Sequence, residues 1–121
     1  MRIGELSVAT GVSIPTIRLY ERECIIAPAA RTDGGFREFS EDHEYQLIFI
    51  KRMRDLGFSL EAVKRLLAIA NGTHEQEFDN VKREFLAMIS HRKRDLAKLE
   101  NLFLSAEGSG SLSSKLKQVF Q

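Results

Sequence analysis

The spacing of apolar residues predicts helices over most of the chain beyond Gly35. In residues 41–57, four apolar side chains recur at helical intervals and are expected to share one face: Tyr45, Phe49, Met53 and Leu56. Ser40 stands before them as the predicted N-cap, and Gly57 ends the segment. A second helix is predicted over residues 60–70, after a cap at Ser59. Its apolar face combines Leu60, Val63, Leu67 and Ala70, and Asn71-Gly72 suits a left-handed helix end.

The third predicted helix is the longest, from about residue 75 to 106. Thr73 and Gln76 have the spacing of a capping box at its start. Apolar residues then alternate in steps of four and three, interrupted by Lys82 and Arg92; they are Phe78, Phe85, Ile89, Leu96, Leu99, Phe103 and Ala106. Such a helix is about 48 Å long, too long for the rest of the chain to cover its stripe.

The uncovered stripe predicts dimerisation. We expect a second copy of the chain to pack on it as a coiled coil. The sequence does not set the orientation of the two helices, although the bulky phenylalanines suit an antiparallel pair better than a regular parallel zipper. The expected dimerisation residues are Phe78, Phe85, Ile89, Leu96, Leu99 and Phe103. Packing of the stripe inside a monomeric bundle is the alternative.

The first third of the chain has the pattern of a helix-turn-helix. Residues 4–10 predict a short helix, Gly11 a turn, and Ser13 the N-cap of a second helix that runs to about Arg22. Pro15 lies in the first turn of that helix, where a missing amide does no harm. Val12, Ile17 and either Cys24 or Ile25 are expected to face inward. The remaining Thr, Arg and Tyr side chains suit the major groove of DNA, although ordinary core packing is an equal alternative for such a short pattern.

A β-hairpin is predicted next. Asp33-Gly34-Gly35 lies between two short extended stretches, and glycine supplies the positive φ that a tight turn needs. After a helix-turn-helix, such a hairpin is interpreted as a wing. Arg31 and Arg37 on this wing are expected to meet DNA phosphates.

Composition narrows the class of protein. The 121 residues include 18 Lys+Arg and 17 Asp+Glu, so bulk charge indicates no partner. The sequence has no membrane-spanning run and no signal peptide, so we expect a cytoplasmic protein with no membrane partner. Cys24 is the one cysteine, which excludes an intramolecular disulfide. No nucleophile, base and orienting group form a recognisable arrangement, so we expect no enzyme.

Five ordered motifs between residues 2 and 70 resemble the MerR family of bacterial transcription regulators. They are Ile3-Gly4-Glu5-Leu6, Gly11-Val12-Ser13, Thr16-Ile17-Arg18-Leu19-Tyr20-Glu21-Arg22, Gly35-Phe36-Arg37-Glu38-Phe39-Ser40 and Arg54-Asp55-Leu56-Gly57-Phe58-Ser59-Leu60. The resemblance implies a mostly α fold: a winged helix-turn-helix with a small two-stranded wing, then a long antiparallel dimerisation helix. It also implies a homodimer that binds a palindromic promoter operator, and bends and untwists it for RNA polymerase.

The resemblance also assigns candidate DNA-binding residues. Arg18 and Tyr20 match family positions that contact bases and phosphates, and Arg37 matches the arginine of the wing. The full predicted set is Ser13, Thr16, Arg18, Tyr20, Arg31, Phe36 and Arg37. Phe36 stands where the family usually has tyrosine, Leu19 where an aromatic residue is common, and Cys24 where glycine is usual. We therefore expect a lost hydroxyl contact at Phe36 and an altered turn at Cys24.

The signal that such a regulator would sense is only partly constrained. Metal-sensing relatives carry cysteines near the start of the long helix and in the loop after it, where this chain has Phe78-Asp79 and Gly108-Ser109-Gly110-Ser111. We therefore expect no cysteine-based metal sensor, no metal site and no cofactor. The three histidines, His43, His74 and His91, are expected at the surface. Cys24 is expected to be a small buried residue, with a one-thiol redox switch as the alternative.

The chain is expected to comprise a DNA-binding domain (1–70), a dimerisation helix (73–107) and a tail (108–121). Apolar residues in the tail have helical spacing: Leu112, Leu116, Val119 and Phe120. The tail is expected either to fold back as a short amphipathic helix, which encloses a pocket for a small apolar ligand, or to be disordered. Two alternatives to a ligand-responsive regulator remain: a constitutive or architectural DNA-binding protein, and a coiled-coil adaptor without DNA.

Overall fold

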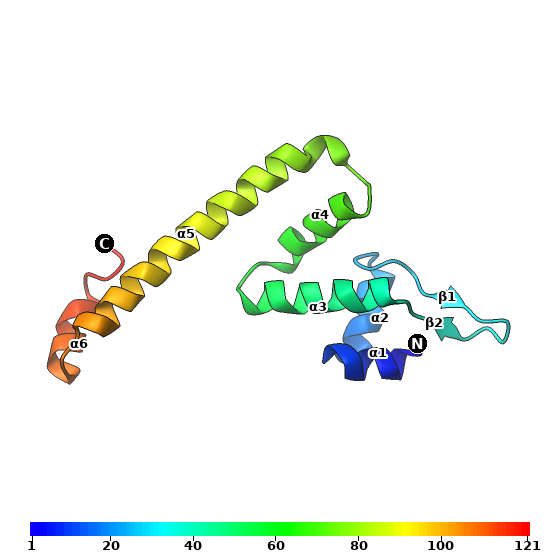
Figure 1. Cartoon of the computed structure of the whole chain (residues 1–121), viewed down its shortest axis with the longest axis horizontal. Helices are drawn as coiled ribbons and strands as arrows, with labels where there is room; N and C mark the ends of the chain where they lie inside the picture. Colours follow the sequence, from blue (N-terminus) through cyan, green and yellow to red (C-terminus); the bar gives the residue numbers. More distant parts are fainter. The chain divides into compact units, whose positions relative to one another are not determined.

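The computed structural model describes residues 1–121, which are mostly helical (Figure 1). The chain divides into two compact units, Met1–Glu77 and Phe78–Gln121. In the first unit the order is α1 (Ile3–Thr10), α2 (Ile14–Arg22), β1 (Ala30–Arg31), β2 (Arg37–Glu38), α3 (Glu41–Asp55), α4 (Leu60–Ala70) and a 3-10 turn (Glu75–Glu77). The second unit consists of α5 (Phe78–Ser105) and α6 (Ser109–Leu116). The predicted fold class, mostly helical with a two-stranded wing and a long C-terminal helix, is confirmed.

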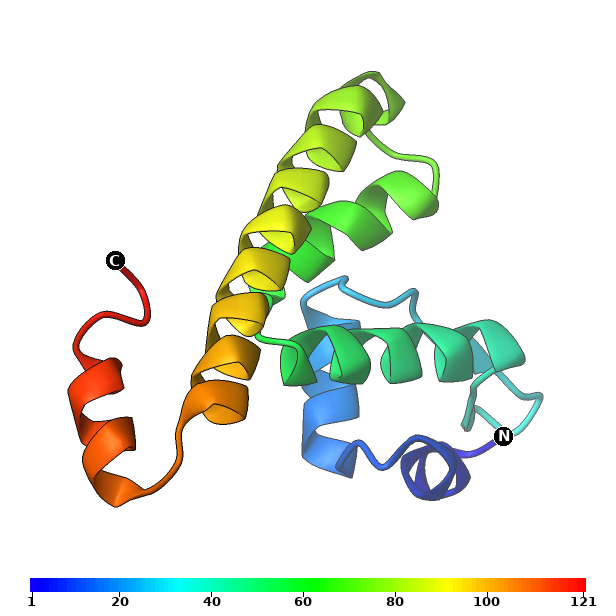
Figure 2. The same ribbon diagram turned by 60° about the vertical axis from the view of Figure 1, so that its left-hand side comes forward.

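The core of the first unit joins its helices to the wing. Helix α1 packs against α2 and α3, and α3 packs against α4 (Figure 2). Fully buried side chains come from each of these elements and from the segments beside the hairpin: Leu6, Ile17, Ile26, Phe39, Leu47, Ile50 and Val63. Burial of such aliphatic and aromatic side chains stabilises each by about 1.5 to 3 kcal/mol. This core therefore holds α2 and the hairpin in place relative to each other.

The helix-turn-helix forms where the sequence predicts it. Gly11 has φ 71°, in the left-handed region that favours glycine, and ends α1. Ser13 is the N-cap of α2, and its hydroxyl oxygen accepts a hydrogen bond from the Thr16 backbone N–H. A side chain at position 11 would also meet the Lys51 ammonium, because a Cβ there lies 2.6 Å from Nζ. The flexible end of Lys51 can move aside, so it is the backbone conformation that requires glycine here.

The apolar face predicted for helix α3 is not the face that the structure buries. Its buried residues are His43, Leu47 and Ile50, whereas Tyr45 is 64% exposed and Leu56 is 65% exposed. The spacing of the apolar residues correctly indicated a helix, but the buried face is a different one and includes a histidine. Two members of the apolar stripe, Tyr45 and Phe49, line a groove of about 670 Å³ between α3 and α4. The groove is bordered by Asp42, Tyr45, Gln46, Phe49, Leu66, Leu67, Ala70 and Asn71.

His43 is buried, which corrects its expected place at the surface. Its Nδ1 accepts a hydrogen bond from the Ser40 backbone N–H at 3.0 Å, so the ring proton lies on Nε2 and is donated to the Ala27 carbonyl at 2.8 Å. The ring also packs edge-on against Phe39. Ser40 is the N-cap residue, as predicted, and forms a capping box with His43. The imidazole therefore connects the start of α3 to the segment after α2.

The end of α4 differs from its prediction in one respect. Ser59 caps the start of α4 as expected and accepts from the Ala62 backbone N–H. The capping box of Thr73 and Gln76 does not form. The Thr73 hydroxyl instead donates to the Ala68 carbonyl at 2.7 Å, and its backbone N–H donates to the same oxygen. Thr73 thus closes α4 rather than opening the next helix, and α5 begins at Phe78.

The second unit contains the predicted long helix and an ordered tail. Helix α5 has 28 residues, and α6 packs against it. The Lys115 ammonium on α6 donates to the Ser105 carbonyl at 3.0 Å, which satisfies a backbone acceptor at the end of α5. A cavity of about 190 Å³ lies between them, lined mainly by polar side chains with Leu102 and Val119. Of the two expectations for the tail, the structure has the short helix against α5, but α6 ends at Leu116, before Val119 and Phe120. None of the helices has the length and apolar character needed to cross a membrane.

Cys24 is exposed, so the expectation that it is a small buried residue is wrong. Ile25 faces inward in its place and is 3% exposed. The backbone of Cys24 has φ 58°, the left-handed conformation that glycine adopts without steric cost. The turn after α2 is therefore kept, and the cysteine occupies a glycine position under backbone strain.

Substitution of Cys24 by glycine is expected to stabilise the protein. A left-handed L-residue costs roughly 1 to 2 kcal/mol, and the extra freedom of glycine in the unfolded chain returns part of this gain. We expect a net increase of about 0.5 to 1 kcal/mol in the free energy of unfolding, measured by urea denaturation. Cys24→Ala keeps the Cβ and removes the thiol, so it should give no such gain. Equal stabilisation by both variants would contradict the strain at this position.

Candidate nucleic-acid interface

Four arginines from α2 and the wing gather around one cavity. The cavity has a volume of about 420 Å³ and is lined by Arg18, Glu21, Arg22, Pro28, Ala29, Arg31 and Arg37. Arg18 and Arg22 are one helical turn apart on α2, and Arg31 faces Arg37 across the two strands. A balanced chain thus presents one locally basic surface. Such a surface attracts a polyanion even where the net charge does not.

Glu21 connects the recognition helix to the wing. Its Oε1 accepts a hydrogen bond from the Arg37 Nε at 3.0 Å, and its Oε2 accepts from the Ala29 backbone N–H at 2.7 Å. The side chain of Glu21 is 12% exposed and that of Arg37 is 45% exposed. Because one carboxylate holds both the entrance of β1 and the arginine of β2, the hairpin is fixed to α2 by charge-assisted hydrogen bonds.

The hairpin itself agrees with the prediction. Strands β1 and β2 are antiparallel, with Ala30 opposite Glu38 and Arg31 opposite Arg37. Gly35 has φ 81° at the turn. The Arg31 Nη1 donates to the Gly35 carbonyl at 2.8 Å, so this arginine folds over the turn of its own hairpin. Phe36 is 56% exposed at the same end of the wing.

The predicted site residues on α2 divide between two flanks of the helix. Thr16 and Tyr20, together with Ser13, line a second cavity of about 380 Å³, which also contains Lys51 and Arg54 of α3. Arg18 lines the arginine cavity on the other flank. The hydroxyls of Ser13 and Thr16 are hydrogen-bonded to each other at 2.8 Å. The structure therefore brings Arg18, Arg31 and Arg37 together, and separates Ser13, Thr16 and Tyr20 from them.

Sequence reasoning missed several residues that shape these surfaces. Glu21 and Arg22 lie between and beside the predicted positions, and Lys51 reaches the Gly11 carbonyl from 40 residues away at 3.4 Å. The i, i+4 spacing of Arg18 and Arg22 is the one local signal for a shared face. The pairing of Glu21 with Arg37 depends on the tertiary fold and has no local signal. DNA contact by the predicted residues stays a prediction.

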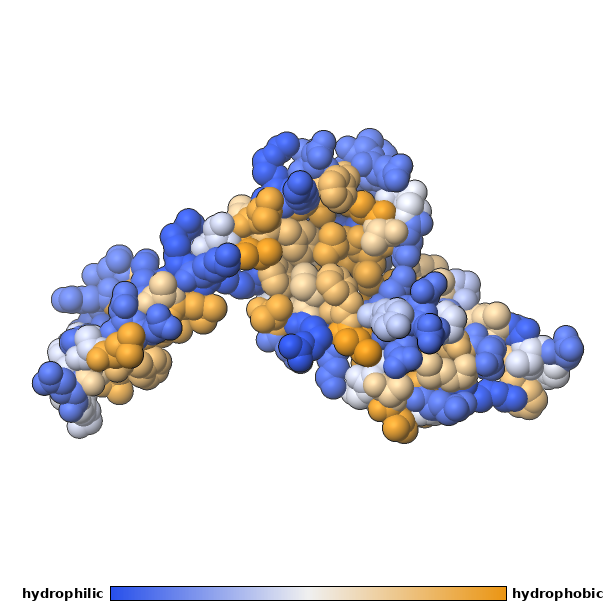
Figure 3. All heavy atoms as spheres, in the orientation of Figure 1, coloured by the Kyte–Doolittle hydropathy of each residue, from blue (hydrophilic) through white to orange (hydrophobic).

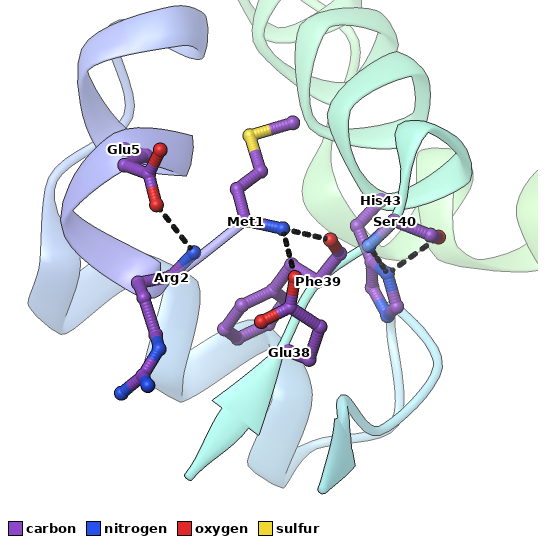
Figure 4. A network of polar contacts seen from close by, with 7 residues as sticks. All are labelled: Met1, Arg2, Glu5, Glu38, Phe39, Ser40 and His43. Atoms are coloured by element: carbon purple, nitrogen blue, oxygen red, sulfur yellow. Dashed lines mark hydrogen bonds and ion pairs between the residues drawn. The ribbon is translucent and has the colours of Figure 1, made fainter. Parts of the chain in front are cut away.

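A polar network anchors the start of the chain to the wing (Figure 4). The terminal ammonium of Met1 donates to Glu38 Oε1 and to the Phe39 carbonyl, both at 2.7 Å. The hydrogen bond from this ammonium and its positive charge hold the pKa of Glu38 below its ordinary value of 4.5. The Phe39 N–H in turn donates to the Met1 carbonyl at 2.7 Å. The segment before α1 is thereby fastened to the end of β2.

The lowered pKa of Glu38 predicts a pH-dependent contribution to stability. A carboxyl whose pKa is lower in the folded state stabilises the fold above its ordinary pKa and loses this effect as the pH falls through the lowered value. We expect Glu38→Gln to unfold at a slightly lower temperature than the parent at pH 7, with the difference vanishing in acid. Thermal denaturation followed by circular dichroism across this range measures it. A difference independent of pH would contradict the assignment.

Comparison with known proteins decides the family. The family model described as MerR HTH family regulatory protein matches residues 1–69, and the model described as MerR, DNA binding matches residues 45–102. The chain belongs to the MerR family. It is a DNA-binding transcription regulator of that family, whose members are not enzymes.

Curated relatives of this MerR-family regulator cover most of its length. It is 38% identical over 101 residues to the HTH-type transcriptional regulator ZntR homolog of Haemophilus influenzae, across 82% of this chain and 75% of that protein. It is 38% identical over 102 residues to the heavy metal-dependent transcription regulator 2 of Rhizobium meliloti, across 84% and 69%. The mercuric resistance operon regulatory protein of Shigella flexneri is 30% identical, across 84% and 71%. We expected that the regulator is not a cysteine-based metal sensor. The names of these relatives, several of which refer to metals, do not support that expectation.

Solved structures share the fold of this MerR-family regulator. The transcription regulator PbrR691 from Ralstonia metallidurans, crystallised in complex with lead(II), has a TM-score of 0.58 and 28% identity, covering 94% of this chain and 98% of that one. HiNmlR, a MerR family regulator lacking the sensor domain and bound to promoter DNA, has a TM-score of 0.55 and 24% identity, covering 95% and 94%. At that identity the second likeness concerns the fold alone.

Proposed function

We propose that this MerR-family regulator binds a palindromic operator within a promoter as a homodimer, and bends and untwists it so that RNA polymerase engages the promoter. The observation that carries the proposal is the arginine cavity between α2 and the wing, where Arg18, Arg31 and Arg37 meet. Arginine forks match both guanine edges and phosphates. A helix with its wing thus reads one half-site. The bacterial cytoplasm, where promoter DNA lies, is the place of action that this function requires.

The exposed stripe of α5 supports the dimer. Phe78 is 50% exposed, Leu96 is 64% exposed and Phe103 is 67% exposed in the single chain, and apolar surface is visible along the second unit at the left of Figure 3. Ile89 is 39% exposed and Leu99 is half-buried, whereas Phe85 is buried, with 8% of its surface exposed. A helix of 28 residues is about 42 Å long. Phe85 is already covered within the single chain, and two such helices side by side would cover the exposed members of the stripe. The resulting two-fold symmetry would match two symmetric half-sites.

Footprinting on the upstream region of the regulator's own gene tests this proposal. We expect DNase protection with two-fold symmetry and, in the activated state, permanganate-reactive thymines at its centre, where the duplex is untwisted. Symmetric protection without distortion under any effector would favour a constitutive or architectural DNA-binding protein. Absence of protection at low salt would favour a coiled-coil adaptor.

The names of the relatives indicate a metal ion as the class of effector. Their names include two heavy metal-dependent regulators and a mercuric resistance regulator. In this chain the one thiol is that of the exposed Cys24, and no group of three His, Cys, Asp or Glu side chains within the single chain is placed to hold an ion. We therefore propose to titrate zinc, lead(II) and mercury(II) into the protein–DNA complex, with Cys24→Ser as the matched variant. A footprint change lost in Cys24→Ser would assign the response to this thiol.

Small apolar compounds form the second arm of the effector search. The groove between α3 and α4 is lined largely by apolar side chains, including Tyr45, Phe49 and Leu66. The cavity between α5 and α6, which the sequence suggested for such a ligand, is smaller and more polar. The apolar ligand stays a prediction, and the same footprint assay with such compounds tests it.

A further inference from the structure

Arg2 stacks on the wing, although no sequence pattern singled it out. Its guanidinium carbon lies 4.2 Å from the centroid of the Phe36 ring. Both side chains are exposed to solvent. We propose that Arg2 is a further DNA-backbone contact, held in position by Phe36. This inference rests on the proposed function and adds a residue beside the wing, on the face opposite to Arg37.

The carboxylates near Arg2 are hydrogen-bonded to other groups. Glu5 Oε1 accepts the backbone N–H of Arg2 at 3.0 Å, and Glu38 Oε1 accepts the terminal ammonium. Figure 4 shows the side chain of Arg2 leading away from the Glu5 carboxylate. A guanidinium stacked on a ring keeps its N–H donors at its edges, where they fit the oxygens of a phosphate. Besides the terminal ammonium, the charge of Arg2 contributes to the lowered pKa of Glu38, but the Arg2 guanidinium forms no ion pair with that carboxylate, so its N–H donors can form such a contact while it stacks.

Arg2, stacked on Phe36, places positive charge on the face of the wing opposite to Arg37. Arg37 turns toward Glu21 on α2, whereas its neighbour Glu38 turns toward the terminal ammonium on the other side. Successive residues of a strand point to opposite faces. Phe36, two residues before Glu38, meets Arg2 on that same opposite side. The wing thus carries arginine on both of its faces.

The ring also replaces part of what the missing hydroxyl would supply. The family resemblance places tyrosine at position 36, where phenylalanine has no group to bond a phosphate. A cation held over an aromatic face is attracted to it and loses side-chain freedom before DNA arrives. Phe36 thereby acts through Arg2 as a positioning residue rather than as a direct polar contact.

The salt dependence of DNA binding tests this role. Fluorescence anisotropy is measured between about 50 and 200 mM salt, with a duplex of the gene's own upstream region and an unrelated duplex of equal length. The plot of log K against log salt has a negative slope. Loss of one phosphate contact makes this slope less steep by about 0.9, or by about 1.8 for a dimer that loses one contact in each subunit. We expect the Arg2→Gln variant to show a salt dependence that is less steep by this amount, and to bind both duplexes more weakly by the same factor. Arg94→Gln, which removes an exposed arginine from α5, should leave the slope unchanged.

Three further variants separate position from charge. Arg2→Lys keeps the charge without the flat fork, so we expect the slope of the parent with weaker binding. Phe36→Leu should weaken binding through the released arginine, and the double variant should bind no worse than Arg2→Gln alone. An unchanged slope in Arg2→Gln, or an equal loss in Arg94→Gln, would overturn the inference while the parent still binds its promoter. A parent that binds neither duplex would overturn the proposed function, and the inference with it.

Discussion

Replacement of Arg18 by alanine is expected to weaken operator binding by about 1 to 3 kcal/mol per half-site. Arg18 is exposed on α2, lines the arginine cavity and lies one turn before Arg22. An arginine in this position either reads a guanine or clamps a phosphate. Anisotropy titrations against the operator and against an unrelated duplex distinguish the two roles. Loss confined to the operator indicates base reading, and equal loss on both indicates a phosphate contact.

A matched arginine on the second unit controls for net charge. Arg94→Ala removes an exposed arginine of α5 and should leave operator affinity near that of the parent. Thermal denaturation of Arg18→Ala should resemble that of the parent, because an exposed side chain contributes little to folding. If Arg18→Ala binds the operator as tightly as the parent, α2 does not enter the groove in the way we propose.

Replacement of Leu96 by glutamate is expected to convert the dimer to a monomer. Leu96 is 64% exposed in the single chain and belongs to the predicted seam of α5. A carboxylate in an apolar interface loses its hydration without a partner, which costs several kcal/mol on each side of a two-fold seam. Sedimentation equilibrium measures the change in mass. Because a monomer engages one half-site at a time, operator affinity should fall by roughly 100-fold or more.

Ala87→Glu is the control for the Leu96 variant. Ala87 is exposed on α5 and lies on the opposite side from the predicted seam positions Phe85 and Ile89. The same charge there should leave both the dimer and operator binding intact. A parent that sediments as a monomer, or a Leu96→Glu variant that still forms the dimer, would contradict the seam and require the stripe to be covered in another way.

The elements of the fold were predictable because local chemistry specifies them. Serines 13 and 59 cap their helices, Gly11 and Gly35 take positive φ, and the hairpin forms around its glycines. The sequence contained less information on which face of a helix is buried. The apolar spacing of α3 is equally regular on its outer face, and only the tertiary fold turns His43 inward, where Ala27 and Ser40 satisfy both ring nitrogens. A buried polar residue hides an inward face from a pattern of apolar positions.

The candidate site was predictable in its arginines and not in what holds them. Arg18 and Arg37 follow from the family resemblance, and the structure places both around one cavity. The carboxylate that binds Arg37 comes from Glu21, 16 residues earlier, and the ring that carries Arg2 comes from the wing. Cys24 adopts a left-handed backbone conformation although it is not a glycine. Contacts of this kind depend on distant segments, which no local pattern describes.

The double hydrogen bond of Glu21 limits how a signal can travel through this protein. Since one side chain bonds both the residue before β1 and the arginine of β2, the helix and the wing approach a half-site as one rigid unit. An inducer would then gain little by tilting the wing alone. Switching would instead come from a change in the separation or rotation of two DNA-binding units whose own shape stays the same. The spacing between half-sites, and not the base sequence within them, would then decide which promoters respond.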